Sequence, residues 1–486
     1  MPEGYNHAVE KFRVTEYPQL KGDAYLDHGG TTIPSKSMID AFAADLTSNL
    51  YGNPHSASTP SHYAGYRIDE IRERTLRFFN ADPKDFDLVF VANATAAIKL
   101  VMECFRDRAS DNAARCGQGS DTESVEFWYG YHRDAHNSLV GVREQASSHR
   151  CFGDDAQVDE WITKTDSAPF ENQLGLFAYP GQSNMTGRRL PLSLSKRIRN
   201  SPRGKNTYTL LDAAALATTS QLDLDTVQPD FTAVSFYKIF GFPNLGGLIV
   251  RKAASHVLRQ RSYFGGGTVD MTSIHERLED GTLPFHSIFA LDAAFTTHKR
   301  LFQSMSRISA HTGYLTKYLH DGMTALRHPN YQPLFRIYNN DSAIYGDTKT
   351  QGATISCSLL ESDGTPITPG DVERTANDQG IFIRSGTLCN PGGVATFLHW
   401  DARELRSMHA NGRGYCSYPY ENYNGKATGV EAPEVSAKKI RTITLHFMEK
   451  KPAPQNPRRT KGVSWSRIKA SLSRTSKGQS EVVLSV

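Results

Sequence analysis

The sequence predicts an α/β protein whose main domain contains a largely parallel β-sheet. Short apolar runs alternate with stretches of helical character, which is typical of strands joined by crossover helices. Several of the runs end in polar residues or in Gly and Pro, which indicates fully buried strands. Ligands bind outside the carboxyl ends of such strands, so polar residues at these positions are candidate site residues.

The expected elements follow one another along the first half of the chain. Strands are expected at 24–26, 88–92, 176–179, 208–211, 232–236 and 247–250. Helices are expected at 61–79 and 95–105. In the segment 61–79, Ala64, Ile68 and Ile71 recur at helical spacing and would form one apolar face.

A change of pattern near residue 300 indicates a second, smaller domain. A long helix is expected at about 290–325, followed by shorter strands. The last segment is rich in Lys, Arg, Ser and Pro, which favours a flexible tail. We therefore expect a large domain over 23–300 and a small domain over 301–448. An arm over 1–22 joins the small domain, and a basic tail covers 449–486.

Composition excludes several classes of protein. The 486 residues include 55 Lys and Arg against 51 Asp and Glu, so the net charge of +4 does not favour nucleic-acid binding through bulk charge. No apolar run approaches the ~20 residues that cross a bilayer, and the first residues lack the apolar segment of a secretory signal. The six cysteines form neither a disulfide framework nor a metal-binding cluster. We expect a cytoplasmic protein without a metal.

Lys238 and Asp212 are the first candidates for chemistry. Lys238 follows the strand 232–236, and a lysine buried there needs neighbours or chemistry that keep it neutral. A Schiff base with pyridoxal phosphate requires such an amine, and a carboxylate such as Asp212 would pair with the ring nitrogen. Alternatively, Lys238 is solvated and Asp212 caps a helix. The turn at 93–97 has backbone N–H groups and the Thr95 hydroxyl that would suit a phosphate.

A set of motifs resembles the class V aminotransferase and cysteine desulfurase family. The motifs occur in the family's order at 25–30, 51–56, 93–97, 135–138, 182–184, 211–214, 235–238, 263–268, 278–282 and 384–392. Within this family they are most similar to the desulfurase domain of the molybdenum cofactor sulfurases. The resemblance implies a type I pyridoxal-phosphate transferase fold: a large domain with a mostly parallel, seven-stranded sheet flanked by helices, and a smaller α+β domain.

The resemblance also implies roles for residues around the cofactor. Lys238 would form the Schiff base and move the α-proton, Asp212 would pair with the pyridinium nitrogen, and His136 would stack on the ring. Asn184 would contact both cofactor and substrate, and Arg384 would bind the substrate carboxylate through two hydrogen bonds. The phosphate would be held by Ala94, Thr95 and Ser235. In a homodimer, Thr268 would reach the phosphate in the neighbouring subunit's site.

Cys389 determines the reaction that we expect. A desulfurase needs a mobile thiolate that accepts sulfur from L-cysteine, and Arg384 lies five residues before Cys389. The residues 390–393, Asn-Pro-Gly-Gly, indicate an exposed turn around this thiol. Cys357, by contrast, lies in an apolar run that is typical of a buried strand.

Some positions differ from the family pattern. Many bacterial desulfurases have His and Gln where this chain has Tyr237 and Ala215, and the sulfurase branch commonly has a further cysteine where this chain has Thr387. Full-length sulfurases continue into a module that binds the molybdenum cofactor, whereas this chain stops soon after residue 447. The sulfur acceptor, a protein or the molybdenum cofactor, is therefore left open.

Three functions follow from these observations. The first is a cysteine desulfurase that converts L-cysteine to L-alanine and keeps the sulfur as a persulfide on Cys389. The second is a pyridoxal-phosphate C–S lyase, aminotransferase or epimerase that acts on another amino acid, for which Cys389 is dispensable. The third is a non-catalytic scaffold for sulfur transfer, which would have no need for the set Lys238, Asp212 and His136.

Overall fold

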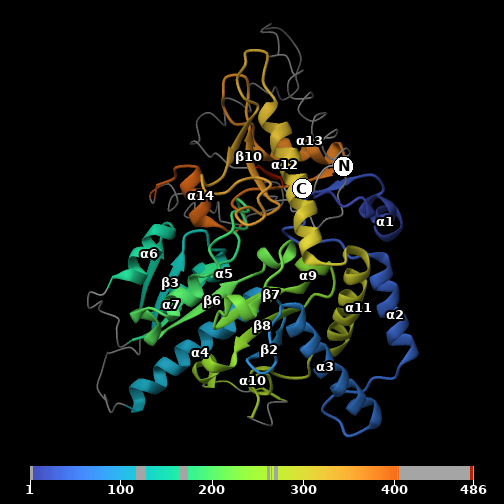
Figure 1. Ribbon diagram of the computed structural model, residues 1–486, viewed down its shortest axis with the longest axis vertical. Coiled ribbons are helices and arrows are strands. Elements are labelled where there is room, and N and C mark those ends of the chain that lie inside the picture. The colour runs from blue at the N-terminus through green and yellow to red at the C-terminus, as the bar shows by residue number, and fades with distance from the viewer. Residues whose placement is uncertain are drawn as a thin grey trace, which may run out of the picture.

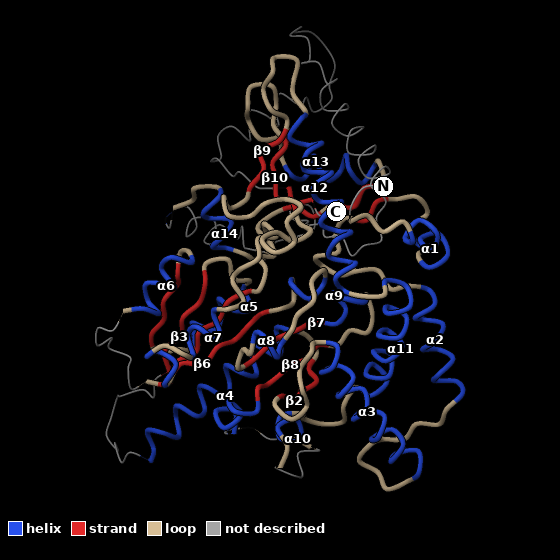
Figure 2. Tube along the Cα trace, viewed as in Figure 1, coloured by secondary structure: helices blue, strands red, loops and turns tan. Residues whose placement is uncertain are grey.

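The computed structural model describes residues 4–115, 127–164, 173–259, 263, 265–266, 272–401, 403 and 482–484. These residues form two groups of elements, one around a large sheet and one around smaller sheets. The long helix α12 (Met305–Ala325) runs from the first group to the second (Figure 1). Helices surround the strands of the large sheet in the lower half of the view in Figure 2.

A seven-stranded sheet is the centre of the first group. Its strands lie in the order β2 (Phe86–Val91), β8 (Gly246–Arg251), β7 (Phe231–Ser235), β6 (Thr207–Asp212), β5 (Leu174–Pro180), β3 (Phe127–His132) and β4 (Ser148–Phe152). Neighbouring strands are parallel except at β8, which is antiparallel to both β2 and β7. This arrangement confirms the predicted mostly parallel sheet.

The predicted strands of this sheet are present, and the structure adds two more. The expected runs become β2, β5, β6, β7 and β8, each within a few residues of its predicted bounds. Strand β4 has three exposed residues in its centre, because it lies at the edge of the sheet, and so no apolar run marks it. In β3 the aromatic run is interrupted by Gly130 and ends in His132.

Helices cover both faces of the seven-stranded sheet. They are α2 (Lys36–Ser48), α3 (Thr59–Phe78), α4 (Ala94–Arg115), α5 (Asn137–Val140), α6 (Asp155–Thr163), α7 (Leu194–Arg199), α8 (Leu224–Val227), α9 (Phe236–Phe240), α10 (Ile274–Leu278) and α11 (Phe285–Phe302). Short 3₁₀ helices connect them: η2 (Gly141–Gln145), η3 (Pro202–Lys205), η4 (Leu216–Thr218) and η5 (Lys252–Arg259). The predicted helices 61–79 and 95–105 are confirmed as α3 and α4.

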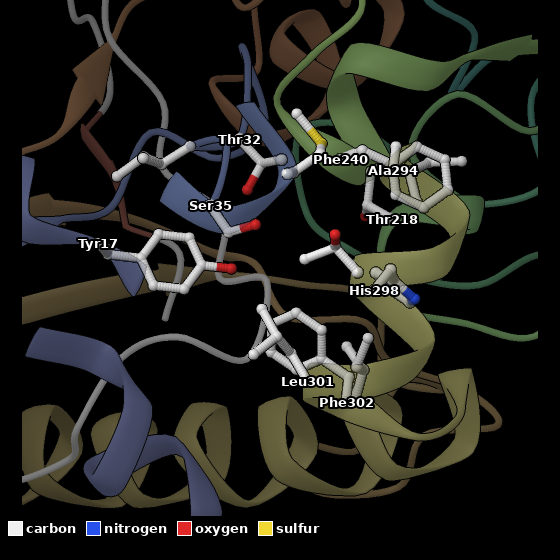
Figure 3. Close-up of a pocket in the computed structure, with 14 residues that line it drawn as sticks. Tyr17, Thr32, Ser35, Thr218, Phe240, Ala294, His298, Leu301 and Phe302 are labelled. Atoms are coloured by element: carbon white, nitrogen blue, oxygen red, sulfur yellow. The ribbon is translucent and has the colours of Figure 1, made fainter. Parts of the chain in front are cut away.

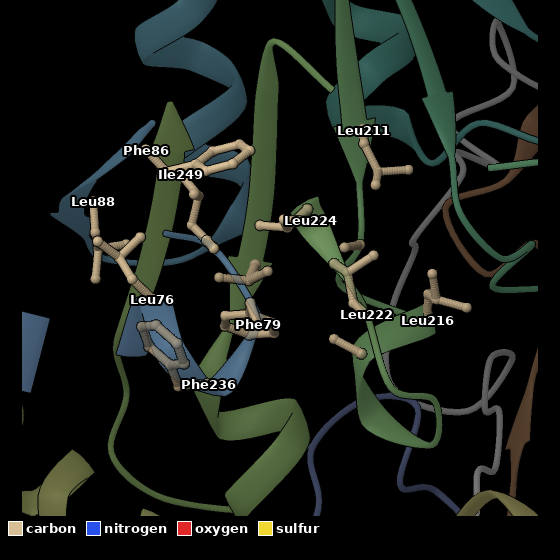
Figure 4. Packing of buried hydrophobic residues seen from close by; sticks show 14 of the residues in the cluster. Leu76, Phe79, Phe86, Leu88, Leu211, Leu216, Leu222, Leu224, Phe236 and Ile249 are labelled. Carbon is tan, nitrogen blue, oxygen red and sulfur yellow. The ribbon is translucent and has the colours of Figure 1, made fainter. Parts of the chain in front are cut away.

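Two apolar cores result, one on each face of the sheet. Successive residues of a strand point to opposite faces, so Leu211 of β6 packs in one core and Leu210 in the other. Figure 4 shows the first core, where Leu211 and Ile249 of the sheet lie among residues that include Leu76 of α3. Burial on both faces explains why these strands appear as continuous apolar runs.

The second group is built on two smaller sheets. Strands β9 (Phe335–Tyr338), β10 (Ile355–Leu359), β12 (Arg384–Ser385) and β13 (Val482–Leu484) form an antiparallel sheet in the order β12-β13-β10-β9. Strand β1 (Ala24–Tyr25), predicted at 24–26, pairs in parallel with β11 (Ile381–Phe382). The other elements are α1 (Ala8–Glu16), η1 (Pro18–Leu20), α13 (Pro369–Asp378) and α14 (Pro391–Phe397).

The structure differs from the sequence-based expectation at two places in this region. The helix expected at 290–325 is two helices, α11 and α12, because Gln303 has a left-handed backbone (φ 67°) and the side chain of Ser304 caps the second helix. Within the expected flexible tail, residues 482–484 form strand β13 between β12 and β10. The rest of that tail lies outside the described residues. In the described part of the chain, no helix combines the length and apolar character needed to cross a bilayer.

Candidate active site

The carboxyl ends of parallel strands bring several predicted site residues to one edge of the large sheet. Strand β6 ends at Asp212, and β7 is followed directly by α9, which contains Lys238. Strand β3 leads to the turn with His136, and β5 leads to the loop with Asn184. Because these four strands are parallel, their ends lie side by side at this edge.

Lys238 lies where charges from several segments meet. Burial lowers the pKa of its amine below the usual value, and the positive charge of Arg384 lowers it further. Three acidic groups act in the opposite direction: Asp212, Cys389 and Asp27. The amine therefore lies close to the predicted carboxylate partner, the predicted substrate arginine and the predicted sulfur-accepting thiol.

Asp212 is a buried carboxylate at the end of β6. Its side chain is held by the turn that follows, because Oδ1 accepts a hydrogen bond of 3.0 Å from the backbone N–H of Ala214. The 3₁₀ helix η4 begins only at Leu216, so Asp212 does not serve as the N-cap that was the alternative interpretation. The carboxylate is thus fixed beside Lys238 by local backbone geometry.

The start of α4 forms a polar corner next to these residues. The N–H of Ala94 donates to Oγ of Ser235 at 2.9 Å, which joins the start of α4 to the end of β7. The hydroxyl groups of Thr95 and Ser138 lie 2.7 Å apart, and Thr95 is exposed. Three hydroxyl groups and the N-terminal end of a 22-residue helix are donors of the type that bind phosphate. Sequence reasoning missed Ser138, which directly follows the His136-Asn137 pair.

His136 belongs to the same site and is neutral at ordinary pH. Burial lowers its pKa to about 4, and the positive charges of Lys238 and Arg384 add to this effect. Its Nδ1 accepts a hydrogen bond of 3.1 Å from the N–H of Ser138, so the ring caps the short helix α5. The ring is therefore fixed by α5, within electrostatic reach of Lys238.

Arg384 in β12 is paired with a residue that sequence reasoning left without a role. Its Nε lies 3.0 Å from Oδ1 of Asp27, in the segment after β1. Burial raises the pKa of Asp27 to about 6, against the lowering effect of Arg384. Gly30 makes space for this pair, because a Cβ at that position would lie 2.3 Å from Nη2 of Arg384. The signal in the sequence was a carboxylate directly after a strand.

The loop around Cys389 corrects one expectation. Residues 390–393 do not form an exposed turn, because Asn390 is fully buried and Pro391 begins α14. The backbone N–H of Asn137 donates to the carbonyl of Cys389 at 2.7 Å, so the loop is packed on the turn after β3. Cys389 itself is partly exposed, and its charge acts on Lys238. Cys357 lies fully buried in β10, as predicted.

A further prediction concerns Thr268 in the motif 263–268. Thr268 lies outside the described residues. Two described residues of the motif 263–268 contact the motif 278–282, since the N–H of Gly265 donates to Oδ1 of Asp280 at 3.1 Å and the N–H of Gly281 donates to the carbonyl of Gly266 at 2.5 Å. These contacts join the predicted motifs 263–268 and 278–282.

A small cavity lies behind the Lys238 turn and is separate from these residues. It has a volume of about 20 Å³, and Ile239 and Phe240 of α9 form part of its wall. Figure 3 shows polar groups from the N-terminal arm and from α11 around it, among them Tyr17 and His298. A space of this size holds about one water molecule rather than a cofactor.

Comparison with known proteins identifies the family. A model of the family described as aminotransferase class-V matches residues 24–116 and 157–399. The chain belongs to this family. A molybdenum cofactor sulfurase from Aspergillus clavatus is 52% identical over 445 residues, which cover 88% of this chain and 51% of that relative. The chain thus spans about half the length of the curated relatives that it matches.

Solved structures confirm the predicted fold of this class V family member. A cysteine desulfurase from Thermococcus onnurineus, solved in its apo form, superposes with a TM-score of 0.67 at 17% identity, covering 91% of this chain and 99% of that one. A C-DES mutant with glycine linked covalently to its PLP cofactor gives a TM-score of 0.60 at 16% identity, covering 88% and 98%. The fold is that of the pyridoxal-phosphate-dependent transferases of type I.

The residues at the sheet edge fit pyridoxal phosphate. The cofactor's aldehyde requires an amine, and burial lowers the pKa of the Lys238 amine. Its ring nitrogen requires a carboxylate, and the buried Asp212 lies beside Lys238. The helix start at Ala94 supplies the hydroxyl and N–H donors that a phosphate requires. All three kinds of partner occur at one edge of one sheet.

Proposed function

We propose that this class V family member is a cysteine desulfurase, which converts L-cysteine to L-alanine and retains the sulfur as a persulfide on Cys389. The observation that supports this proposal most strongly is the 2.7 Å hydrogen bond from the N–H of Asn137 to the carbonyl of Cys389, because it packs the Cys389 loop on the turn that contains His136. The charge of the partly exposed Cys389 also raises the pKa of Lys238, which supports a thiol within electrostatic reach of this amine. The relative from Aspergillus clavatus is named a sulfurase and the structural neighbour from Thermococcus onnurineus a desulfurase, which also supports this proposal.

Pyridoxal phosphate would be held by residues from four strand ends. Lys238 would hold its aldehyde carbon, Asp212 its ring nitrogen and His136 one face of its ring. Its phosphate would lie against the backbone of Ala94 and the hydroxyl groups of Thr95 and Ser235, with Thr268 of a neighbouring subunit completing the site. When bound, the cofactor supplies an electron sink that stabilises negative charge at the α-carbon of the substrate.

The protein's own side chains would carry out the remaining steps. Arg384 and Asn184 would orient the carboxylate of L-cysteine, and the Lys238 amine would take the α-proton at Nζ. The Cys389 thiolate would then attack the substrate sulfur, so that a sulfur–sulfur bond forms and the bond between sulfur and Cβ breaks. The electron pair of the broken bond would go to Cβ, which gains the proton released when Cys389 ionised, and Lys238 would return the α-proton to Cα, so that the carbon product is alanine. One thiol and one cysteine thus give one persulfide and one alanine.

The partners of the reaction are part of the same proposal. The persulfide would pass its sulfur to an acceptor, a protein or the molybdenum cofactor named for the relatives. The loop that contains Gly265 and Gly266 would complete the site of a second subunit in a homodimer. A cytoplasmic location suits this chemistry, because thiols there are kept reduced. The two groups of elements would act as a large domain (23–300) and a small domain (301–448), with an arm over 1–22.

The test measures turnover in the purified, cofactor-loaded protein. L-Cysteine should yield alanine and protein-bound persulfide, and Cys389→Ser should abolish both while the visible absorbance of the bound cofactor remains. Cys151→Ser is the matched control, because Cys151 is exposed on the edge strand β4. Sulfur release by Cys389→Ser at the wild-type rate would contradict the proposal and favour a C–S lyase.

A further inference from the structure

Asn390 is fully buried and connects the Cys389 loop to two other segments. Its Nδ2 donates to the backbone carbonyl of Asp134 at 3.1 Å and to Oδ1 of Asn184 at 3.0 Å. Its Oδ1 accepts from the N–H of Gly393 at 2.9 Å, which caps α14. One amide group therefore joins the turn after β3, the loop after β5 and the start of α14.

Asn184 completes the connection from the opposite side. Its Oδ1 accepts from Asn390, and its Nδ2 donates to the carbonyl of Leu388 at 2.7 Å. Asn184 thus binds the residue before Cys389, and Asn390 is the residue after it. The two side chains form an amide latch, defined here as Asn184 and Asn390, that holds the Cys389 loop at both ends.

The backbone at Cys389 needs such a support. Leu388 and Cys389 both have left-handed φ values, 61° and 56°, which non-glycine residues rarely adopt. A strained conformation of this kind persists only where surrounding contacts hold it. The Leu388 side chain is buried in an apolar cluster with Met185 and Val394, so packing and hydrogen bonds act together.

We infer that Asn390 is a positioning residue for the Cys389 thiol, acting through the amide latch to keep the thiol beside Lys238. The inference rests on the proposed function, since it gives the latched thiol a role in sulfur acceptance. The sequence predicted a mobile thiol. With the latch in place, the Cys389 thiol instead stays in one position while it receives sulfur. The acceptor would then have to reach this position, because the loop is held in place.

The test separates the latch from the helix cap of the same residue. Asn390→Asp keeps the oxygen that accepts from Gly393, and Asp is a good N-cap, but it loses the donor to Asp134 and Asn184. Asn184→Asp loses the donor to Leu388 and serves as the second variant. Asn339→Asp is the matched control, because Asn339 also donates its amide to a backbone carbonyl and a side chain, those of Ala343 and Gln351.

The first readout is the rate at which a bulky maleimide alkylates each cysteine, followed by peptide mass mapping. Asn390→Asp and Asn184→Asp should raise the Cys389 rate about tenfold, the order expected for the loss of a buried hydrogen bond that joins the loop to the protein. The rates of the buried Cys104 and Cys357 should not change, nor should any rate in Asn339→Asp. A parallel rise at Cys357 would show a general loss of stability, and an unchanged Cys389 rate would also overturn the inference.

The second readout is the yield of persulfide per alanine with L-cysteine. It should fall in Asn390→Asp, where the loop has lost the latch, and should stay at the wild-type value in Asn339→Asp. An unchanged yield would overturn the inference. If the wild-type protein forms no alanine but its Cys389 alkylation still depends on the latch, the desulfurase proposal fails and the latch stands as a structural finding.

Discussion

Gly30 is required by the geometry of Arg384. A Cβ at residue 30 would lie 2.3 Å from Nη2 and 2.9 Å from Cζ of the guanidinium, and also 3.1 Å from Oδ1 of Asp27. Gly30→Ala should therefore displace Arg384 and raise the KM for L-cysteine at least about tenfold, since a hydrogen bond to a charged group contributes about 1.5–3 kcal/mol. The absorbance of the bound cofactor should be retained.

The control for this substitution is Gly65→Ala in α3, where a Cβ meets nothing within 4 Å. It should leave the KM unchanged. Steady-state kinetics with L-cysteine decide the question. Equal KM values for Gly30→Ala and Gly65→Ala would mean that Arg384 does not bind the substrate carboxylate.

At the scale of elements, a buried ion pair fixes the segment that follows α10. The guanidinium of Arg72 in α3 lies 2.7 Å from Oε1 and 3.0 Å from Oε2 of Glu279, and both side chains are less than a tenth exposed. Glu279 also accepts from the N–H of Phe90 in β2 at 2.7 Å. The motif 278–282 is thus held against the sheet, and it also contacts Gly265 through Asp280.

Glu279→Gln should lower the free energy of unfolding by about 3 kcal/mol, because it leaves the Arg72 charge buried without a counter-charge. The matched control is Glu73→Gln, which removes the partner of Arg77 in an exposed pair of α3 and should cost less than about 0.5 kcal/mol. Urea unfolding measures both. Equal losses in the two variants would show that burial of the Arg72–Glu279 pair has no energetic consequence.

The elements also show how far the sequence could predict the structure. Apolar runs predicted β5 to β8 because these strands are buried on both faces. The break between α11 and α12 was missed because apolar spacing continues across it, whereas the left-handed backbone of Gln303 and the Ser304 cap that mark it do not change that spacing. The contacts of Asn390 with Asp134 and Asn184 were missed because these residues lie more than 200 positions away in the sequence, beyond any local pattern.

At the scale of the whole molecule, buried titratable groups shape the dependence of stability on pH. Burial lowers the pKa of His298 from 6.5 to about 4, so the unfolded chain binds a proton in this range that the folded protein excludes. Stability from this group is lost as the pH falls from about 6.5 toward about 4, by up to about 1.4 kcal/mol per pH unit. His136 acts in the same direction. Asp27 and Glu373, whose pKa values are raised to about 6 and about 7, act in the opposite direction.

His298→Phe should therefore flatten the loss of stability over this range, since it keeps a ring against Phe240 and removes the titration. The measurement is the free energy of unfolding at two pH values. One lies above about 6.5, and the other lies midway between about 6.5 and about 4. The comparison with the wild-type protein isolates His298, because the other three groups are common to both. An identical fall in both proteins would contradict the burial effect on His298.

In the proposed reaction, sulfur reaches Cys389 at a site assembled from both groups of elements. The most direct test of this reaction incubates the cofactor-loaded protein with one equivalent of L-cysteine and maps the added sulfur by peptide mass, with alanine quantified in the same sample. The peptide that contains Cys389 should gain the mass of one sulfur atom, in proportion to the alanine formed. Alanine without sulfur on that peptide, or sulfur on another cysteine, would contradict it.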